Sequence, residues 1–258
     1  MRLNVKNIEK NLKSAAIGRQ IEYYERVTST MDVGREKAES GVMEGSVVVA
    51  EEQISGRGRF GRKWVSTPGE DLTFSIVLYP GIWAVARLTI AAAVVVARVL
   101  SRGYGLKPGI KWPNDVRVNG KKICGILVET AFQDDQVRYA LIGIGININQ
   151  SPDNLDGETV PQTTSIAHEV GHKIEREEVL ESVLLELSYV YSSLEEWGTV
   201  WSDWQKAMEH LGENIKVLWG DRVEEGIAEG VDNDGNLLMR RKDGSVVSLA
   251  AGDVSFQV

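Results

Sequence analysis

Residues 110–130 read IKWPNDVRVNGKKICGILVET, two strand-like runs on either side of Asn119-Gly120. Asn-Gly supplies the two positive-φ positions of a type I′ turn, whose twist matches that of paired antiparallel strands. The flanking runs, Ile110–Val118 and Lys122–Thr130, are rich in β-branched and apolar residues. This stretch therefore predicts a β-hairpin, the clearest in the chain.

Helical and strand-like patterns alternate along the rest of the chain. Ser29 and Thr30 are good N-caps for a helix over 31–40 that Gly41 ends. The run 84–102 is apolar nearly all round and too long for an ordinary strand, which predicts a buried helix. These patterns predict an α+β fold with a mixed β-sheet and flanking helices. The other expected elements are strands over 45–53, 71–79 and 137–149 and a helix over 174–196.

The chain changes character near Glu213. No proline follows Pro161, and from Glu213 onward short alternating runs are separated by Asp234-Gly235 and Asp243-Gly244. Meandering hairpins of this kind predict a small β-barrel, close to the lower size limit for independent folding. We expect a large domain over 1–212 and a companion domain over 213–258 that docks on it.

Composition argues against several functional classes. The chain has 258 residues, and 29 basic against 37 acidic side chains give it a formal charge of −8. Nonspecific nucleic-acid binding needs many cations spread over one face, so the acidic balance argues against it. No charge-free run is long enough to cross a bilayer, and the charged N-terminus lacks the apolar core of a signal peptide. The single cysteine, Cys124, excludes an intrachain disulfide, so we expect a cytoplasmic protein without a membrane partner.

Residues 56–64 read GRGRFGRKW and form a charged loop between two predicted strands. Glycines let consecutive backbone N–H groups form an anion-binding nest, and Arg57, Arg59 and Arg62 add planar donors for phosphate or carboxylate. The loop lacks the Gly-Lys-Ser/Thr ending of the Walker loop, and it does not open a helix as the dinucleotide fingerprint does. We expect it to be mobile when empty and to order on an anionic ligand. A solubilising or RNA-contacting Arg/Gly segment is the alternative.

Three further motifs carry polar or glycine residues at unusual places. Residues 111–115 (KWPND) interrupt a strand-like arm, and a proline there predicts a bulge or a sheet edge. Lys122 follows the Asn119-Gly120 turn and precedes 124–127 (CGIL). Residues 143–147 (GIGIN) place glycines in a strand, which allows a flat ligand to approach closely.

Together the four motifs resemble the biotin protein ligases, also called biotin–[acetyl-CoA-carboxylase] ligases. The likeness covers 29–149, and 216–256 is similar to the small C-terminal SH3-like domain of that family. It implies a catalytic domain like that of class II aminoacyl-tRNA synthetases plus an SH3-like β-barrel. The implied reaction uses ATP and Mg²⁺ to convert biotin into biotinyl-5′-AMP and pyrophosphate. A lysine of a biotin carboxyl carrier protein or domain, part of a biotin-dependent carboxylase, then accepts the biotin.

The resemblance also implies roles for individual residues. Arg59, Lys122 and Lys111 are the expected catalytic cations. Asp115 is a candidate for holding the metal or for taking the proton of the acceptor lysine, and no metal cage made by the protein alone is expected. The biotin-binding residues implied are Ser29, Thr30, Met31, Gln53, Gly56, Arg57, Gly58, Arg59, Lys122, Gly125, Gly143 and Gly145. The ATP-binding residues implied are Arg57, Arg59, Arg62, Trp64, Lys111, Asn114 and Asn147.

The chain departs from the family pattern in two places. Met31 stands where the family usually has asparagine, so one polar contact to the bicyclic ring is missing or is supplied by water. Only 28 residues precede Ser29, which leaves no room for the winged-helix domain of the larger members, so we expect no DNA partner. Members often pair through the main sheet, and a homodimer is expected by analogy alone.

Three other activities compete with this interpretation. Residues 168–172 (HEVGH) match the zinc-protease pattern, but Gly171 is expected to end the helix before His172. Lipoate ligases and octanoyltransferases share the fold, and Cys124 beside Lys122 invites the role of a cysteine nucleophile, although those relatives lack the GRGRxGR loop. A nucleic-acid binder would use the arginine loop and exposed tryptophans. Trp64 and Trp112 lie inside the polar motifs, which makes them better candidates for contacting a ligand than the other tryptophans.

Overall fold

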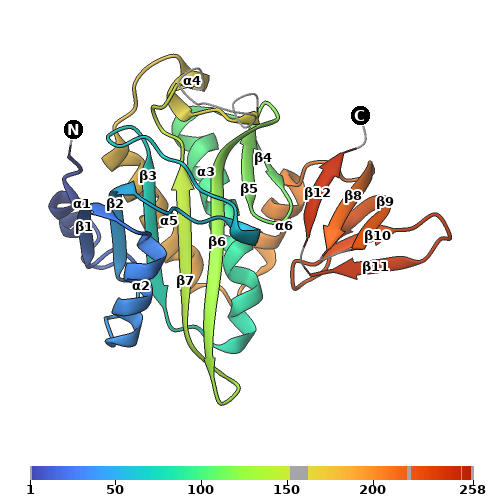
Figure 1. Cartoon of the computed structure of the whole chain (residues 1–258), viewed down its shortest axis with the longest axis horizontal. Helices are drawn as coiled ribbons and strands as arrows, with labels where there is room; N and C mark the ends of the chain where they lie inside the picture. The colour runs from blue at the N-terminus through green and yellow to red at the C-terminus, as the bar shows by residue number, and fades with distance from the viewer. Residues whose placement is uncertain (1, 152–161, 220–221, 251, 257–258) are drawn as a thin grey trace.

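The computed structural model of the protein describes residues 2–151, 162–219, 222–250 and 252–256. The described strands form a large seven-stranded mixed sheet and a five-stranded antiparallel sheet near the C-terminus (Figure 1). The strands of the large sheet are β1 (Ile21–Val27), β2 (Val47–Gln53), β3 (Leu72–Leu78), β4 (Pro108–Lys111), β5 (Asp115–Val118), β6 (Lys121–Gln133) and β7 (Gln136–Ile146). Their order is β1-β2-β3-β7-β6-β5-β4, with β1 parallel to β2 and the other neighbours antiparallel.

Both faces of the large sheet carry hydrophobic clusters, and successive side chains of a strand point to opposite faces. On β3, Phe74 and Ile76 belong to the main hydrophobic core, whereas Val77 belongs to a second, smaller cluster. Two long helices cover the main-core face, and a shorter helix that carries Met31 covers the other (Figure 1). The long helices are α3 (Val85–Tyr104) and α5 (Arg176–Ser192), and the shorter helix is α2 (Thr30–Glu39).

The main predicted elements are confirmed. Ser29 caps α2 with a side chain that accepts a hydrogen bond from the backbone N–H of Met31, and α3 ends at Gly105 in the left-handed conformation. By length and composition Ile82–Tyr104 could cross a membrane, but 61% of its apolar window is buried, as the prediction of a core helix requires. Three elements were not predicted, because they are short or carry mainly polar residues: α1 (Val5–Asn11), β1 and α6 (Gly198–Ala207).

The central hairpin is confirmed, and one of its arms differs from the prediction. Asn119 and Gly120 have φ values of 51° and 73°, as a type I′ turn requires. The arm Ile110–Val118 is not one strand with a bulge. The chain reverses inside the 111–115 motif, so that β4 and β5 pair with Lys111 opposite Asp115. Pro113 has no N–H to donate to a ladder, and a turn accommodates it more easily than a strand does.

The C-terminal strands form an open sheet rather than the predicted closed barrel. Their order is β11-β10-β9-β8-β12, and within the described residues no ladder joins β11 to β12. Both terminal strands span only four residues, so few backbone groups are available to close the ends. The five strands are β8 (Asn214–Trp219), β9 (Arg222–Val231), β10 (Leu237–Arg240), β11 (Val246–Leu249) and β12 (Asp253–Phe256).

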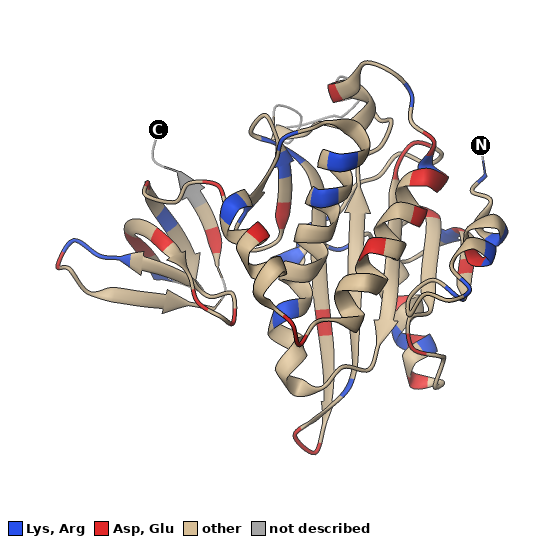
Figure 2. Cartoon of the chain, turned by 180° about the vertical axis from the view of Figure 1, so that it is seen from behind, with Lys and Arg blue, Asp and Glu red and all other residues tan. Residues whose placement is uncertain are grey.

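The C-terminal sheet packs against the 111–115 turn and α3. The indole N–H of Trp112 donates a hydrogen bond to the Gly235 carbonyl oxygen at 2.9 Å. A Cβ on Gly235 would stand 2.5 Å from Ile90 Cδ1, so only glycine lets this turn approach α3 so closely. Seen from the helical side, basic and acidic residues are interspersed on the large sheet's helices (Figure 2). That face offers no continuous basic surface for a nucleic acid.

Candidate functional site

A cavity of about 600 Å³ opens over β3, β7 and β6, beside the 111–115 turn and under the 56–64 loop. Of the eighteen residues implied by the resemblance, only Gly56 does not line it. Gly56 lies at the neck of the loop, where its carbonyl oxygen accepts a hydrogen bond from Trp64 N at 2.9 Å. A Cβ there would stand 2.4 Å from the Trp64 carbonyl oxygen, so the neck requires glycine. The fold thus gathers all four motifs around one cavity.

The 56–64 loop folds back on itself as a small hairpin. Arg57 pairs with Lys63 in an antiparallel bridge, and Gly58 N donates to the Arg62 carbonyl oxygen at 2.8 Å. Phe60 at the tip has a φ of 54°, an uncommon conformation for a bulky residue. The prediction that this loop orders only on an anionic ligand stays a prediction.

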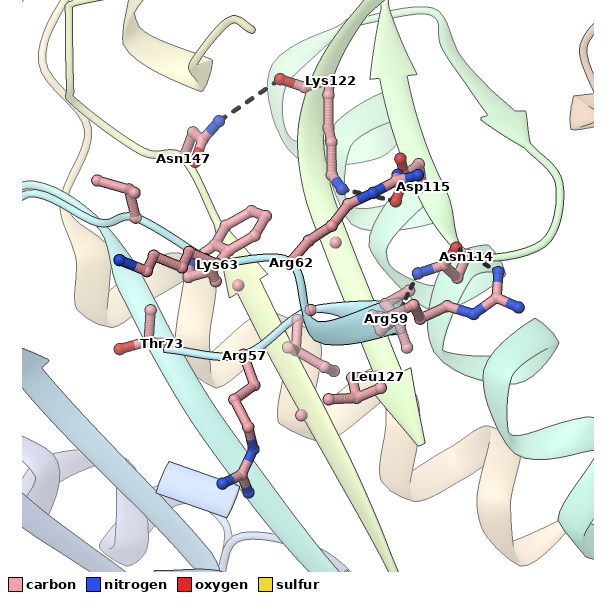
Figure 3. Close-up of a pocket in the computed structure, with 18 of the residues that line it drawn as sticks. Arg57, Arg59, Arg62, Lys63, Thr73, Asn114, Asp115, Lys122, Leu127 and Asn147 are labelled. Atoms are coloured by element: carbon pink, nitrogen blue, oxygen red, sulfur yellow. Dashed lines mark hydrogen bonds and ion pairs between the residues drawn. The ribbon is translucent and has the colours of Figure 1, made fainter. Parts of the chain in front are cut away.

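The three loop arginines point in different directions (Figure 3). Arg57 Nη1 lies 2.5 Å from Asp32 Oδ1, away from the other two arginines. Arg59 Nη1 donates to Asn114 Oδ1 at 3.4 Å and to the Gly252 carbonyl oxygen at 3.2 Å. Arg62 forms an ion pair with Asp253 of β12. Asp253 belongs to the C-terminal sheet and Gly252 directly precedes it, so the site includes residues from both sheets.

Two lysines complete the cationic wall. Lys122 Nζ lies 2.7 Å from Asp115 Oδ1 and 5.4 Å from the centre of the Trp64 ring. Lys111 lies on the neighbouring β4, and burial lowers the pKa of its ammonium group. Burial likewise lowers the pKa of the Arg59 guanidinium. Because the charged forms are incompletely solvated here, an anion entering the cavity would restore favourable interactions that burial has removed.

At the other end of the cavity, hydroxyl and amide groups form a polar corner. Gln53 Oε1 accepts hydrogen bonds from Thr30 N at 2.8 Å and from Thr30 Oγ1 at 3.1 Å. Ser29 Oγ donates to the same oxygen at 3.4 Å, and Ser75 Oγ donates to Thr30 Oγ1 at 2.8 Å. Ser29 therefore combines helix capping with a place in the cavity wall. Ser75 was not predicted, because a serine inside an apolar strand carries no local signal.

Glycines on two adjacent strands form the cavity floor, and the protein's own side chains cover them. Gly125 of β6 pairs with Gly145 of β7. A Cβ on Gly145 would stand 2.2 Å from Trp64 Cε2, and one on Gly143 would stand 2.7 Å from Met31 Sδ. The close approach predicted for a ligand is thus made by Trp64 and Met31. Trp64 Nε1 is buried and has no hydrogen-bond partner among the described residues.

The two predicted asparagines use their amide nitrogens to fix the backbone. Asn114 Nδ2 donates to the Ile126 carbonyl oxygen at 2.7 Å. Asn147 is 2% exposed, and its Nδ2 donates to the Thr164 carbonyl oxygen at 3.0 Å. Trp112 also lines the cavity, but its indole N–H bonds to the C-terminal sheet, so it joins the two sheets as well. Asp253 was missed entirely, since only the docking of the C-terminal sheet brings it to the cavity.

Two competing motifs lack the geometry that their chemistry needs. The helix α4 (Ile166–Val170) ends at Gly171, which has a φ of 81°, so His172 lies beyond the helix that carries His168. No cluster of three potential metal-ligating residues occurs in the part of the chain that the structure describes. Cys124 is fully buried, and burial raises the pKa of its thiol, which disfavours the nucleophilic thiolate.

The chain has clear relatives among known proteins. Residues 23–147 match the model of the biotin/lipoate A/B protein ligase family, and residues 210–257 match that of the biotin protein ligase C terminal domain. The biotin–[acetyl-CoA-carboxylase] ligase of Paracoccus denitrificans is 35% identical over 224 residues, which cover 83% of this chain and 92% of the relative. The bifunctional ligase/repressor BirA of Bacillus subtilis is 34% identical over 247 residues, which cover 94% of this chain and 76% of the relative.

Solved structures agree with these sequence relatives. The biotin protein ligase from Aquifex aeolicus in complex with biotin and ATP superposes with a TM-score of 0.76 and is 29% identical. That match covers 92% of this chain and 98% of the other. The biotin protein ligase from Leishmania major in complex with biotinyl-5-AMP superposes with a TM-score of 0.62, at 29% identity, over 90% of this chain and 99% of the other.

Proposed function

The chain belongs to the biotin protein ligases, and from this premise we propose that it activates biotin with ATP and transfers it to a protein lysine. In the first step a biotin carboxylate oxygen attacks the α-phosphorus of ATP, and the bond to the bridging oxygen breaks to release pyrophosphate. In the second step a lysine amine attacks the acyl carbon of biotinyl-5′-AMP. An amide forms, AMP leaves, and the amine loses a proton.

One observation carries the proposal: a single cavity joins an uncharged polar corner to a wall of cations. The polar corner of Ser29, Thr30 and Gln53 offers hydroxyl and amide groups that match a urea ring, which both donates and accepts hydrogen bonds. Adenylyl transfer needs mainly positioning and neutralisation of developing negative charge. Arg59 and Lys122 belong to the wall of cations and are our candidates for that task.

The remaining cations surround the proposed nucleotide side. Lys111 lies beside Asp115 at the 111–115 turn, and Arg62 reaches the same side from the loop. Trp64, whose buried N–H has no hydrogen-bond partner in the described part of the chain, offers a flat apolar surface for a base. Arg57 takes a different role in our proposal, because its pair with Asp32 anchors the base of the loop to α2.

The residues present also fit Mg²⁺ bound together with ATP. Mg²⁺ usually retains several waters and binds through substrate phosphates plus one or two carboxylates. Asp115 and Asp253 are the carboxylates among the described residues that line the cavity. We assign Asp115 to the metal or to the proton of the acceptor lysine, since it lies at the start of β5 beside the 111–115 turn and already faces the Lys122 ammonium.

The wider assignments rest on family membership. The acceptor is a biotin carboxyl carrier domain, and the enzyme acts in the cytoplasm. The boundary at 212/213 between a catalytic and a C-terminal domain, and the homodimer, belong to the same proposal. Limited proteolysis tests the domain boundary, and light scattering tests the homodimer.

The direct test measures pyrophosphate release with ATP and biotin, followed by transfer of labelled biotin to a carrier domain. Arg59→Ala and Lys122→Ala should each lower the release rate by at least about 100-fold, the size of effect seen when one stabilising donor is removed. Arg240→Ala removes an arginine–glutamate pair of the C-terminal sheet outside the cavity and is the matched control. Release with lipoate or octanoate and none with biotin would overturn the proposal.

A further inference from the structure

Met31 occupies an unusual position in the cavity wall. It is the second residue of α2, directly after the polar Ser29 and Thr30, yet its thioether is 3% exposed. It lines the cavity and also belongs to the second hydrophobic cluster, together with Val77 and Leu141. Met31 therefore separates the cavity from the apolar packing on that face of the sheet.

The Met31 side chain and Gly143 fit each other. A Cβ on Gly143 would stand 2.7 Å from Met31 Sδ and 3.3 Å from Met31 Cγ, so the thioether fills the space that the glycine leaves on β7. Leu127, which packs against the second cluster, lines the cavity on the neighbouring β6. Met31 and Leu127 thus form an apolar wall beside the polar corner of Ser29, Thr30 and Gln53.

We propose that Met31 is a specificity-determining residue that closes the acid pocket on its apolar side and restricts it to carboxylic acids with a polar ring. This inference rests on the proposed function. The polar corner already pairs its own groups, so an acid that enters must replace those hydrogen bonds, which a urea ring can do and a hydrocarbon chain cannot. A hydrocarbon chain gains no hydrogen bond at the polar corner, and the Met31 thioether keeps it from reaching the apolar side chains of Val77 and Leu141.

Removing the thioether should connect the cavity with the second cluster. Met31→Ala deletes the atoms that lie against Gly143 and leaves space bounded by the apolar side chains of Val77 and Leu141. Such space favours an alkyl chain or a dithiolane ring. Met31→Leu keeps a similar volume without opening the wall and should preserve the selectivity.

The test measures pyrophosphate release with ATP and each of four acids: biotin, desthiobiotin, lipoate and octanoate. For Met31→Ala we expect the biotin KM to rise by about 10-fold or more, the typical effect of lost packing in an apolar pocket, with kcat changed less. The ratio of kcat/KM for lipoate or octanoate to that for biotin should rise by at least the same factor. Met31→Leu should keep this ratio within about threefold of the wild type.

Met239→Ala is the matched control, because Met239 is equally buried but lies in the C-terminal sheet away from the cavity. It should lower the melting temperature without changing the ratio between acids. If Met31→Ala does not fold, Gly143→Ala tests the same contact from the other side, since its Cβ would push the thioether into the cavity and should raise the biotin KM.

The outcomes separate this inference from the proposed function. A wild-type enzyme that releases no pyrophosphate with biotin overturns the proposed function. If the wild-type enzyme does release pyrophosphate with biotin, and a folded Met31→Ala variant has the same acid selectivity as the wild type, only the role of Met31 is overturned. In the alternative experiment, a Gly143→Ala variant with the wild-type biotin KM would likewise overturn only the role of Met31.

Discussion

Replacing Gly145 by alanine should displace Trp64 from the cavity while leaving the sheet folded. The added Cβ would stand 2.2 Å from Trp64 Cε2 and 2.5 Å from Trp64 Nε1, whereas nonbonded carbon atoms in contact are about 3.5–4.0 Å apart. The strand cannot yield, because Gly145 pairs with Thr73 on one side and with Gly125 on the other. The indole ring must therefore move by more than about 1 Å.

A displacement of this size in a positioning group costs about 100-fold in rate. We expect kcat/KM for biotin-dependent pyrophosphate release to fall by about that factor, with little change in the melting temperature. Gly230→Ala, in β9, is the control, because nothing lies within 4 Å of its added Cβ. A Gly145→Ala enzyme with wild-type kcat and wild-type KM for both substrates would refute the reasoning that Trp64 must lie on this floor.

Three other perturbations test separate parts of the structure. Cys124→Ala should retain turnover with biotin in the pyrophosphate assay, because burial raises the pKa of the thiol and keeps it protonated; abolished acyl transfer would instead favour a cysteine nucleophile. Arg176→Met leaves Glu51 without the guanidinium 2.8 Å away and should destabilise the fold by about 3–5 kcal/mol. The corresponding fall of roughly 6–20 °C in the melting temperature can be measured by calorimetry, and an unchanged midpoint would contradict it. Burial raises the pKa of Asp71 from 3.8 to about 6, so its contribution to stability is complete below pH 3.8 and is lost as the pH rises through about 6. Urea unfolding at several pH values should show this loss of stability in the wild type and not in Asp71→Asn. The same pH dependence of the free energy of unfolding in both proteins would argue against a role for Asp71.

The motifs of the site could be located from the sequence, because their residues have few other structural uses. Three arginines spaced by glycines between two strands are typical of an anion-binding loop, and Asn119-Gly120 determines its own turn. The way these motifs meet could not be predicted, since β7 inserts between β3 and β6 and brings Gly145 beside Gly125. Strand order of this kind depends on packing across the whole sheet and leaves no local pattern.

The contacts between the two sheets could not be predicted from the sequence either. Nothing near Asp253 indicates that it pairs with Arg62, because that neighbour comes from a segment folded into the other sheet. The closed barrel was wrongly predicted for a related reason, as alternating hydrophobicity specifies strands but not whether the first and last of them pair. Trp112 looked like a ligand residue from its motif, and its bond to Gly235 became visible only after docking.

The contacts that Arg59 and Arg62 make with Gly252 and Asp253 have a thermodynamic consequence. A ligand that binds only the folded loop raises the free energy of unfolding, by about 2.7 kcal/mol at a hundredfold excess over its Kd. Because the loop is tied to β12, this increment should reach the C-terminal sheet as well, and both sheets should melt in one cooperative transition.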